Sequence, residues 1–237
     1  MDISVSLLTL AAVALGAVIQ GSLGFGMAMV AAPILLLLDP RLVPGPLLCA
    51  ILCVTVLMTR REWRHIAPSA IAWAGVGGVP GSLIGAWATV AVAADILGNA
   101  LGVMIISAVI MSALGHRLRP SPVALVAAGA VSGVMGAVLS MGGPPLALLY
   151  QDQPGGELRG TLAGYFTLAA LVALGALVVV GNFGWSEVYL ALPLVPAALA
   201  GYALSGWVAP RLNKSAARRA VLFLAGAAGV AVVVRYW

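Results

Sequence analysis

The sequence predicts an all-α polytopic membrane protein made of two inverted repeats. Of its 237 residues, 62% are hydrophobic and 8% are charged, whereas about 25% of the residues of a soluble domain are charged. A soluble globule of this length could not bury so much apolar surface. Charges and prolines divide the chain into eight apolar segments, four in each half, and the first segment of each half is too long for a single span.

The first half, residues 1–117, opens with this kind of overlong segment. It is uncharged from Ile3 to Leu38, and an unbroken helix of that length would measure about 54 Å, against a bilayer core of about 30 Å. Glycine tolerates sharp turns, so we expect the helix to break at residues 21–26. Three ordinary spans are then expected, at 42–59, 68–94 and 96–115.

The second half, residues 118–237, follows the same plan. Its overlong segment covers 121–151, with a glycine-rich break expected at 133–143. Three further spans are expected, at 161–180, 188–210 and 220–234.

Short motifs repeat between the halves as well. Both overlong segments read G-x-x-G, then eight residues, then Pro, and Pro80 and Gly85 recur as Pro196 and Gly201. The first motif consists of Gly21, Gly24 and Pro33, and the second of Gly133, Gly136 and Pro145.

The basic loops suggest how the segments cross the membrane. These loops lie at 60–65, 116–120 and 211–219. If every segment crossed once, the loops would be divided between the two sides, against the tendency of basic loops to stay in the cytoplasm. If each overlong segment enters and returns, all three loops are cytoplasmic, both termini are outside and the halves are inverted, a common plan in transporters. A parallel duplication with four plain spans in each half is the alternative.

The two breaks are the candidate substrate-binding site. Backbone N–H groups at a broken helix end can replace the water around an anion, aided by the helix dipole. Ser22 and Ser140 would add hydroxyl donors, Phe25 and Met141 would form apolar walls or gates, and Pro144 could begin a half-helix. The alternative is that the glycines only pack helices together. The candidate residues are Gln20, Gly21, Ser22, Gly24, Phe25 and Gly26, with Ser140, Met141, Gly142, Gly143 and Pro144.

Other kinds of site find little support in the sequence. GSLGFG matches a loose nucleotide-binding motif, but no strand precedes it. Cys49 and Cys53 are one helical turn apart without a further Cys or His at depth, so we expect them to pack rather than bind a metal. No nucleophile and base are placed for catalysis, so neither an enzyme nor a cofactor is expected. The net charge of +5 is attributed to cytoplasmic loops and not to nucleic-acid binding.

Several polar and aromatic residues lie at the expected segment ends. Arg159 could either attract anions at the cytoplasmic mouth or serve as an ordinary positive anchor, and His65 is expected at the membrane interface. Trp63, Trp185 and Trp237 are interpreted as interface anchors.

The motifs GSLGFGMAMVAAP and GVMGAVLSMGGPP, followed by Arg159-Gly160-Thr161, resemble those of the TauE/SafE sulfite exporter family. The resemblance extends over the whole chain. It implies a permease of the prokaryotic cytoplasmic (inner) membrane for small sulfur-containing anions such as sulfite or organosulfonates.

We therefore expect a secondary transporter that exports such an anion by alternating access around the paired breaks. A passive anion channel or facilitator is the alternative. The expected partners are the anion and the lipid bilayer, and the sequence assigns no oligomeric state.

Overall fold

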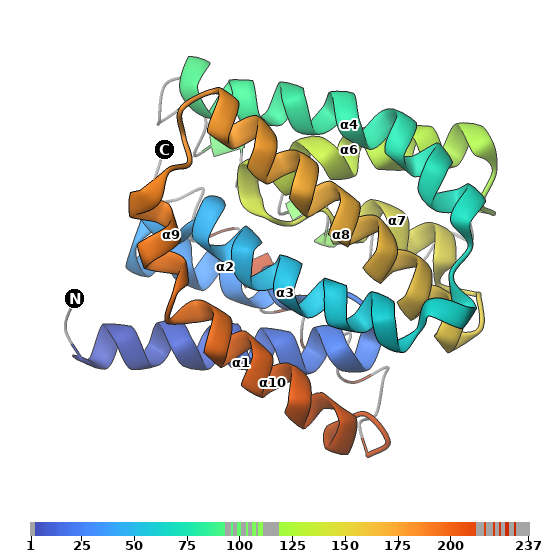
Figure 1. The fold of residues 1–237 in the computed structure, drawn as a ribbon, viewed down its shortest axis with the longest axis horizontal. Coiled ribbons are helices and arrows are strands. Elements are labelled where there is room, and N and C mark those ends of the chain that lie inside the picture. Colours follow the sequence, from blue (N-terminus) through green and yellow to red (C-terminus); the bar gives the residue numbers. More distant parts are fainter. Residues whose placement is uncertain are drawn as a thin grey trace.

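The computed structural model describes residues 3–92 and 119–211, with scattered positions between 96 and 110 and between 216 and 230. The regular elements of this part are helices (Figure 1). They are α1 (Ile3–Leu23), α2 (Met27–Leu38), η1 (Pro40–Leu42), α3 (Gly45–Arg61), η2 (Trp63–His65), α4 (Pro68–Ala91), α6 (Pro122–Leu139), α7 (Gly143–Tyr150), α8 (Gly155–Val179), α9 (Trp185–Ala191) and α10 (Leu194–Val208).

Six helical stretches within the described ranges are long and apolar enough to cross a membrane. The predicted all-α membrane fold is thus confirmed. The stretches are Val5–Leu23, Pro40–Arg61, Pro68–Ala91, Pro122–Leu139, Gly155–Val179 and Trp185–Val208.

Both overlong segments are interrupted. We call residues 24–26, between α1 and α2, the first break, and residues 140–142, between α6 and α7, the second break. Each break follows a helix long enough to span the bilayer and precedes a shorter one, of 12 residues in α2 and 8 in α7. The shorter helices are about 18 Å and 12 Å long and cannot cross a core of about 30 Å.

Left-handed backbone conformations end the two long helices. Gly24 has φ 98° and Gly26 has φ 119°, values that glycine adopts without steric cost. At the end of α6 the left-handed residue is Ser140, with φ 61°. Its N–H donates to Gly136 O at 2.8 Å, the bond of an αL cap, and the next N–H donates to Met135 O at 3.3 Å.

The two breaks are separated by a different number of residues from the two glycine motifs. The motifs align Gly24 with Gly136, 112 residues apart. In the structure α1 ends at Leu23 and α6 at Leu139, so the breaks are 116 residues apart and Gly24 corresponds to Ser140. This is also the spacing of Pro80 and Pro196. The helix ends are determined by left-handed caps, and Gly136 lies inside α6 as an ordinary helical residue.

Two expected elements differ in detail. Helix α8 begins at Gly155, six residues before the expected start, so that Arg159-Gly160-Thr161 is helical. The expected span at 188–210 is two helices, α9 and α10, separated at Leu192–Pro193 because a proline inside a helix removes a hydrogen bond and clashes with the preceding turn. The spans expected at 96–115 and 220–234 lie outside the described residues apart from scattered positions, and Met1 and Trp237 lie wholly outside them.

Glycines allow α4 and α6 to touch backbone to backbone. A Cβ added to Gly81 would collide with Ala130 O of α6, and one added to Gly133 would collide with Gly78 O of α4. Along the two helices, Gly77 meets Val126 O, Gly81 meets Ala130 O and Gly85 meets Val134 O. The contacts therefore advance in the same direction on both helices, and α4 and α6 are parallel. Small residues at such crossings permit the close packing expected between membrane helices.

Helices α1 and α10 are also close and parallel. A Cβ on Gly201 would collide with Ala14 O, and further along both helices Gly21 packs against Ser205. In both pairs, therefore, a helix from the first half of the chain packs against a helix from the second half.

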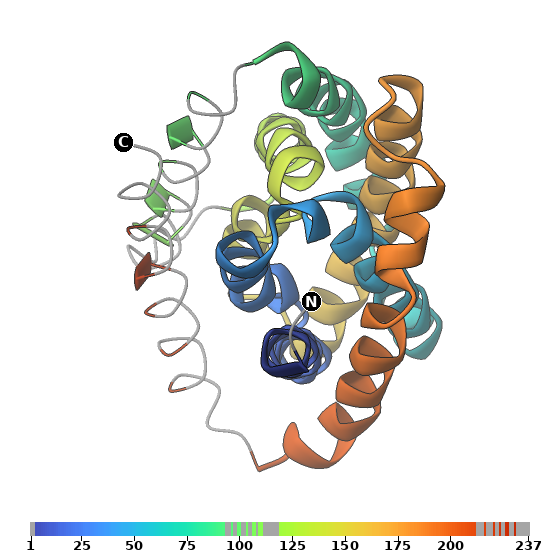
Figure 2. The ribbon, with the colours of Figure 1, turned by 90° about the vertical axis from the view of Figure 1, so that its left-hand side faces the viewer.

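The remaining contacts fix the directions of the helices. Helix α3 is antiparallel to α8. Glu62, just after the end of α3, accepts from Arg159 near the start of α8 at 3.0 Å. Thr59, earlier in α3, contacts Thr167 in the middle of α8 at 3.2 Å. Helix α3 runs in the same direction as α1, because Arg61 at its end donates to Gly21 O at the end of α1, at 3.1 Å. Helices α1, α3 and α10 thus run one way and α4, α6 and α8 the other, as the sequence colours in Figure 1 show. Figure 2 views the molecule from the side on which α1 begins.

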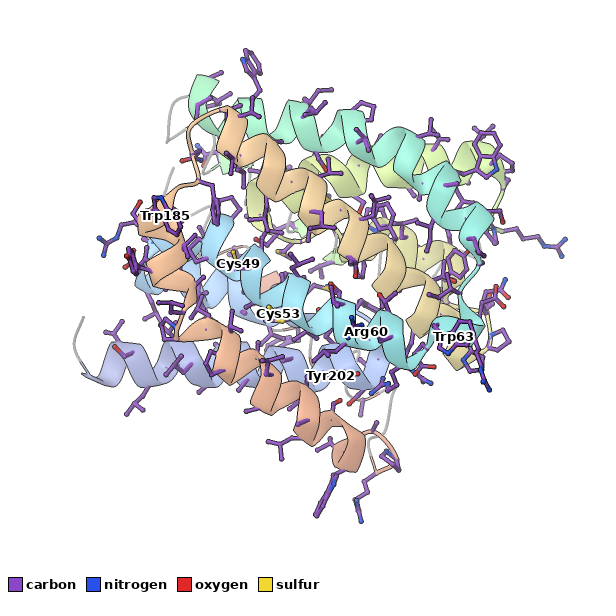
Figure 3. The ribbon with its side chains drawn as sticks, viewed as in Figure 1. Cys49, Cys53, Arg60, Trp63, Trp185 and Tyr202 are labelled. Carbon is purple, nitrogen blue, oxygen red and sulfur yellow. The ribbon has the colours of Figure 1, made fainter. Side chains whose placement is uncertain are left out.

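We call the end of the molecule where α3 finishes and α4 and α8 begin the basic end, on the right in Figure 1. It carries Arg60, Arg61, Arg64 and Arg159. Trp63 lies at this end, and Trp185 lies at the opposite end (Figure 3). Both indole side chains are exposed, at 64% and 79%, which fits the expected interface anchors.

Candidate functional site

One cavity joins the two breaks. Its empty space amounts to about 500 Å³, part of it open to the surface. The wall includes Phe25 and Gly26 of the first break and Ser140, Met141 and Gly142 of the second. Helices α1, α2, α3, α6, α7 and α8 supply the rest of the wall.

Gln20 is the main polar side chain on the first side of the cavity. It is 3% exposed and belongs to the last turn of α1. Its Oε1 accepts a hydrogen bond from Met27 N at the start of α2, at 3.2 Å, so the side chain bridges the break. Its Nε2 has no hydrogen-bond partner among the described residues. A buried donor of this kind is rare and calls for a partner.

The start of α2 adds backbone donors beside this amide. The first N–H groups of a helix have no acceptor within it, and the N-cap residue Gly26 has no side chain to cap them. Met27 N is bound by Gln20, while Ala28 and Met29 follow in the cavity wall. Their amides lie at the positive end of the α2 dipole, where an anion is favoured.

The second break contributes fewer donors. Helix α7 begins Gly143-Pro144-Pro145, and proline has no N–H, so Gly143 is the main backbone donor of its first turn. The hydroxyl of Ser140 donates to Pro44 O at 3.0 Å. The cavity therefore has one side rich in donors, at the first break, and one that is poorer.

Seven of the predicted site residues line the cavity and four do not. Gly21 packs against Tyr202 and Ser205 of α10. The hydroxyl of Ser22 donates to Val18 O at 2.7 Å and is thus engaged within α1. Gly24 faces Arg159 on the other side of the break, and Pro144 is buried in α7. The residues in the wall are Gln20, Phe25, Gly26, Ser140, Met141, Gly142 and Gly143.

The structure adds wall residues that sequence reasoning missed. Ser132 of α6 lines the cavity and donates through its hydroxyl to Gly142 O, which pins the second break. Its position two helical turns before Ser140 is a signal that could have identified it. Ile51 of α3 and Phe166 of α8 also line the cavity, but they lie in uniformly apolar spans, where the sequence does not distinguish one residue from another.

The cavity wall is neutral, since its side chains are apolar, hydroxyl or amide groups. In the described ranges no three His, Cys, Asp or Glu side chains form a group suited to a metal ion. Cys49 and Cys53 are free and lie one turn apart on α3 (Figure 3). A ligand that suits this cavity is therefore small and offers acceptor atoms to amide donors.

Comparison with known proteins identifies a family. The family model described as "Sulfite exporter TauE/SafE" matches residues 8–232, nearly the whole chain. No curated protein and no solved structure gives a significant match.

Proposed function

We propose that this chain, which belongs to the sulfite exporter TauE/SafE family, is a secondary transporter that exports a small sulfur-containing oxyanion such as sulfite or an organosulfonate. The family is one of membrane exporters of sulfite and related anions. The observation that carries the proposal is Gln20 Nε2, a buried donor without a partner among the described residues, in a cavity between two broken helices.

The anion would lie against the start of α2. Gln20 Nε2 and the amides of Ala28 and Met29 would donate to its oxygens, and the helix dipole would favour its charge. Phe25 and Phe166 would limit the entry of water. An oxyanion suits the site because its several acceptor oxygens match several converging donors.

Residues 1–117 and 118–237 are proposed to form inverted repeats. Helices α1 and α3 run one way with α2 returning between them, and α6 and α8 run the other way with α7 returning between them. The spacing of 116 residues between the breaks supports the same division. Discontinuous helices at a repeat interface are a recurrent feature of transporters.

The moving bodies are proposed to differ from the two sequence halves. The glycine crossings bind α4 to α6 and α1 to α10, each across the division between halves. Rocking one half against the other would separate backbones that touch at Gly81 and Gly133. We place α1, α2 and α10 in one body and α4, α6 and α7 in the other, with α3 and α8 between them.

The basic end is proposed to face the cytoplasm, by the positive-inside tendency. Single cysteines replacing Trp63 and Trp185, in a background with Cys49→Ala and Cys53→Ala, would test this. We expect Trp63→Cys to react with an impermeant maleimide only in inside-out vesicles and Trp185→Cys only in intact cells. Reaction of both from the same side would refute the orientation.

Counterflow in proteoliposomes tests the transport mode. Radiolabelled sulfite should enter faster when unlabelled sulfite is trapped inside, because a carrier that returns loaded exchanges faster than one that returns empty. Empty liposomes and proteoliposomes with the Gln20→Glu variant are the controls. Sulfite conductance without stimulation from the opposite side would indicate a channel, and the absence of either would refute sulfite as substrate.

A further inference from the structure

Three basic side chains converge on one buried carboxylate at the basic end. Glu62 follows α3, and its side chain is 9% exposed. Its Oε1 accepts from Arg159 Nε at 3.0 Å and lies 3.3 Å from Arg61 Nε. Its Oε2 lies 3.4 Å from His65 Nδ1. The two arginines outnumber the single carboxylate, so the group carries an excess of positive charge even when His65 is neutral.

The bases are more accessible to water than the acid that they surround. Arg159 is 26% exposed, Arg61 39% and His65 59%, against 9% for Glu62. An anion arriving from solution at the basic end would therefore meet the bases before it reached the carboxylate.

The same two arginines contact the end of α1 and the first break that follows it. Arg61 Nη2 donates to Gly21 O at 3.1 Å, and a Cβ on Gly24 would lie 3.1 Å from Arg159 Cγ. The next residues, Phe25 and Gly26, line the cavity. The Gly24–Gly26 loop thus lies between the bases around Glu62 and the cavity. The two glycines that flank Phe25 in this loop have φ 98° and 119°.

We infer that Arg61, His65 and Arg159 form a second anion-binding site at the basic end. In this structure the Glu62 carboxylate occupies the position that the transported oxyanion would take. A carboxylate and a small oxyanion present similar oxygen acceptors to guanidinium donors. When the arriving anion displaces the Glu62 carboxylate, the anion would lie next to the Gly24–Gly26 loop. The inference rests on the proposed function for the identity of the anion.

Equilibrium binding of radiolabelled sulfite to the purified full-length protein tests this site. Glu62→Gln removes the competing charge and keeps the size of the side chain, so we expect it to tighten sulfite binding about tenfold. Arg159→Gln should weaken binding more in the Glu62→Gln background than in the wild type, where Arg159 is already occupied by Glu62. Glu157→Gln is the matched control, since it removes the same charge two residues from Arg159 and should leave the affinity within about twofold.

A purely structural ion pair would give a different result. Both Glu62→Gln and Arg159→Gln would then lower the melting temperature and leave the sulfite affinity unchanged, which would overturn the inference while leaving the proposed function standing. Combining Glu62→Gln with Gln20→Ala separates the two sites. If the double variant still binds sulfite tightly, the second site is supported. If Gln20→Ala alone abolishes sulfite binding, the anion binds only in the cavity. Absence of binding to the wild type and to Glu62→Gln would defeat both proposals.

Discussion

Replacing Gly81 by leucine is expected to abolish the folded protein. Gly81 lies where α4 crosses α6, and a Cβ there would collide with Ala130 O. The obstruction is backbone, so no side-chain rotation can relieve it. Overpacking a core typically costs about 1–3 kcal/mol, and here the two helices must separate along their whole contact. We expect the yield of monodisperse protein, measured by size-exclusion chromatography after mild solubilisation, to fall at least about tenfold.

Gly175→Leu is the matched control for this variant. Gly175 lies inside α8, and a Cβ added there would meet no atom within 4 Å. Because glycine is about 1 kcal/mol less favourable than alanine in a helix interior, this substitution should leave the yield unchanged or raise it. Gly81→Ala should give an intermediate yield. Equal yields from Gly81→Leu and Gly175→Leu would show that the α4–α6 crossing tolerates separation.

The sequence predicted the breaks because their cause is local. Length and glycine content are enough to show that residues 3–38 cannot form one straight span. The exact position of the second break was harder to predict, since its left-handed residue is Ser140, a residue type without the conformational freedom of glycine. The nearby Gly136, which attracted the motif alignment, is helical instead.

Whether a glycine packs against another helix or faces the cavity depends on tertiary contacts, and the local sequence does not determine it. Gly21, Gly24 and Gly26 occur within six residues, yet they face α10, Arg159 and the cavity, respectively. The packing interpretation thus fits Gly21, whereas a binding role stays a proposal, for which Gly26 is placed in the cavity wall. Glu62 went unrecognised for a similar reason, since in sequence it is one acid in a basic loop and only the fold brings Arg159 to it.

The two serines show that residue type alone does not tell which hydrogen bonds a hydroxyl already makes. Ser22 and Ser140 were predicted to donate to the anion because a hydroxyl near a broken helix suits that role. In the structure each hydroxyl already donates to a backbone carbonyl, Val18 O and Pro44 O. Gln20 has two polar atoms, and its Oε1 is engaged with Met27 N while Nε2 has no partner among the described residues. It is therefore the strongest side-chain donor for the proposed site.

Gln20→Glu is expected to eliminate anion transport while preserving the fold. A glutamate has nearly the same shape, and one of its oxygens can still accept from Met27 N. A negative charge next to the start of α2 is also compatible with the helix dipole. The substitution removes the Nε2 donor and places a charge against the substrate. At about 4 Å and an effective dielectric constant of about 20, that repulsion reaches ~4 kcal/mol, or about a thousandfold in affinity.

Sulfite counterflow at about pH 8, where a carboxyl group is normally ionised, measures this loss, and the melting temperature reports on the fold. Gln153→Glu, in the loop between α7 and α8, makes the same chemical change outside the cavity wall and should transport like the wild type. Gln20→Leu removes both polar atoms, so it should lower stability as well as transport because Met27 N loses its acceptor. Unchanged transport by Gln20→Glu would place the anion elsewhere, since a bound oxyanion could not tolerate a carboxylate in the position of its donor.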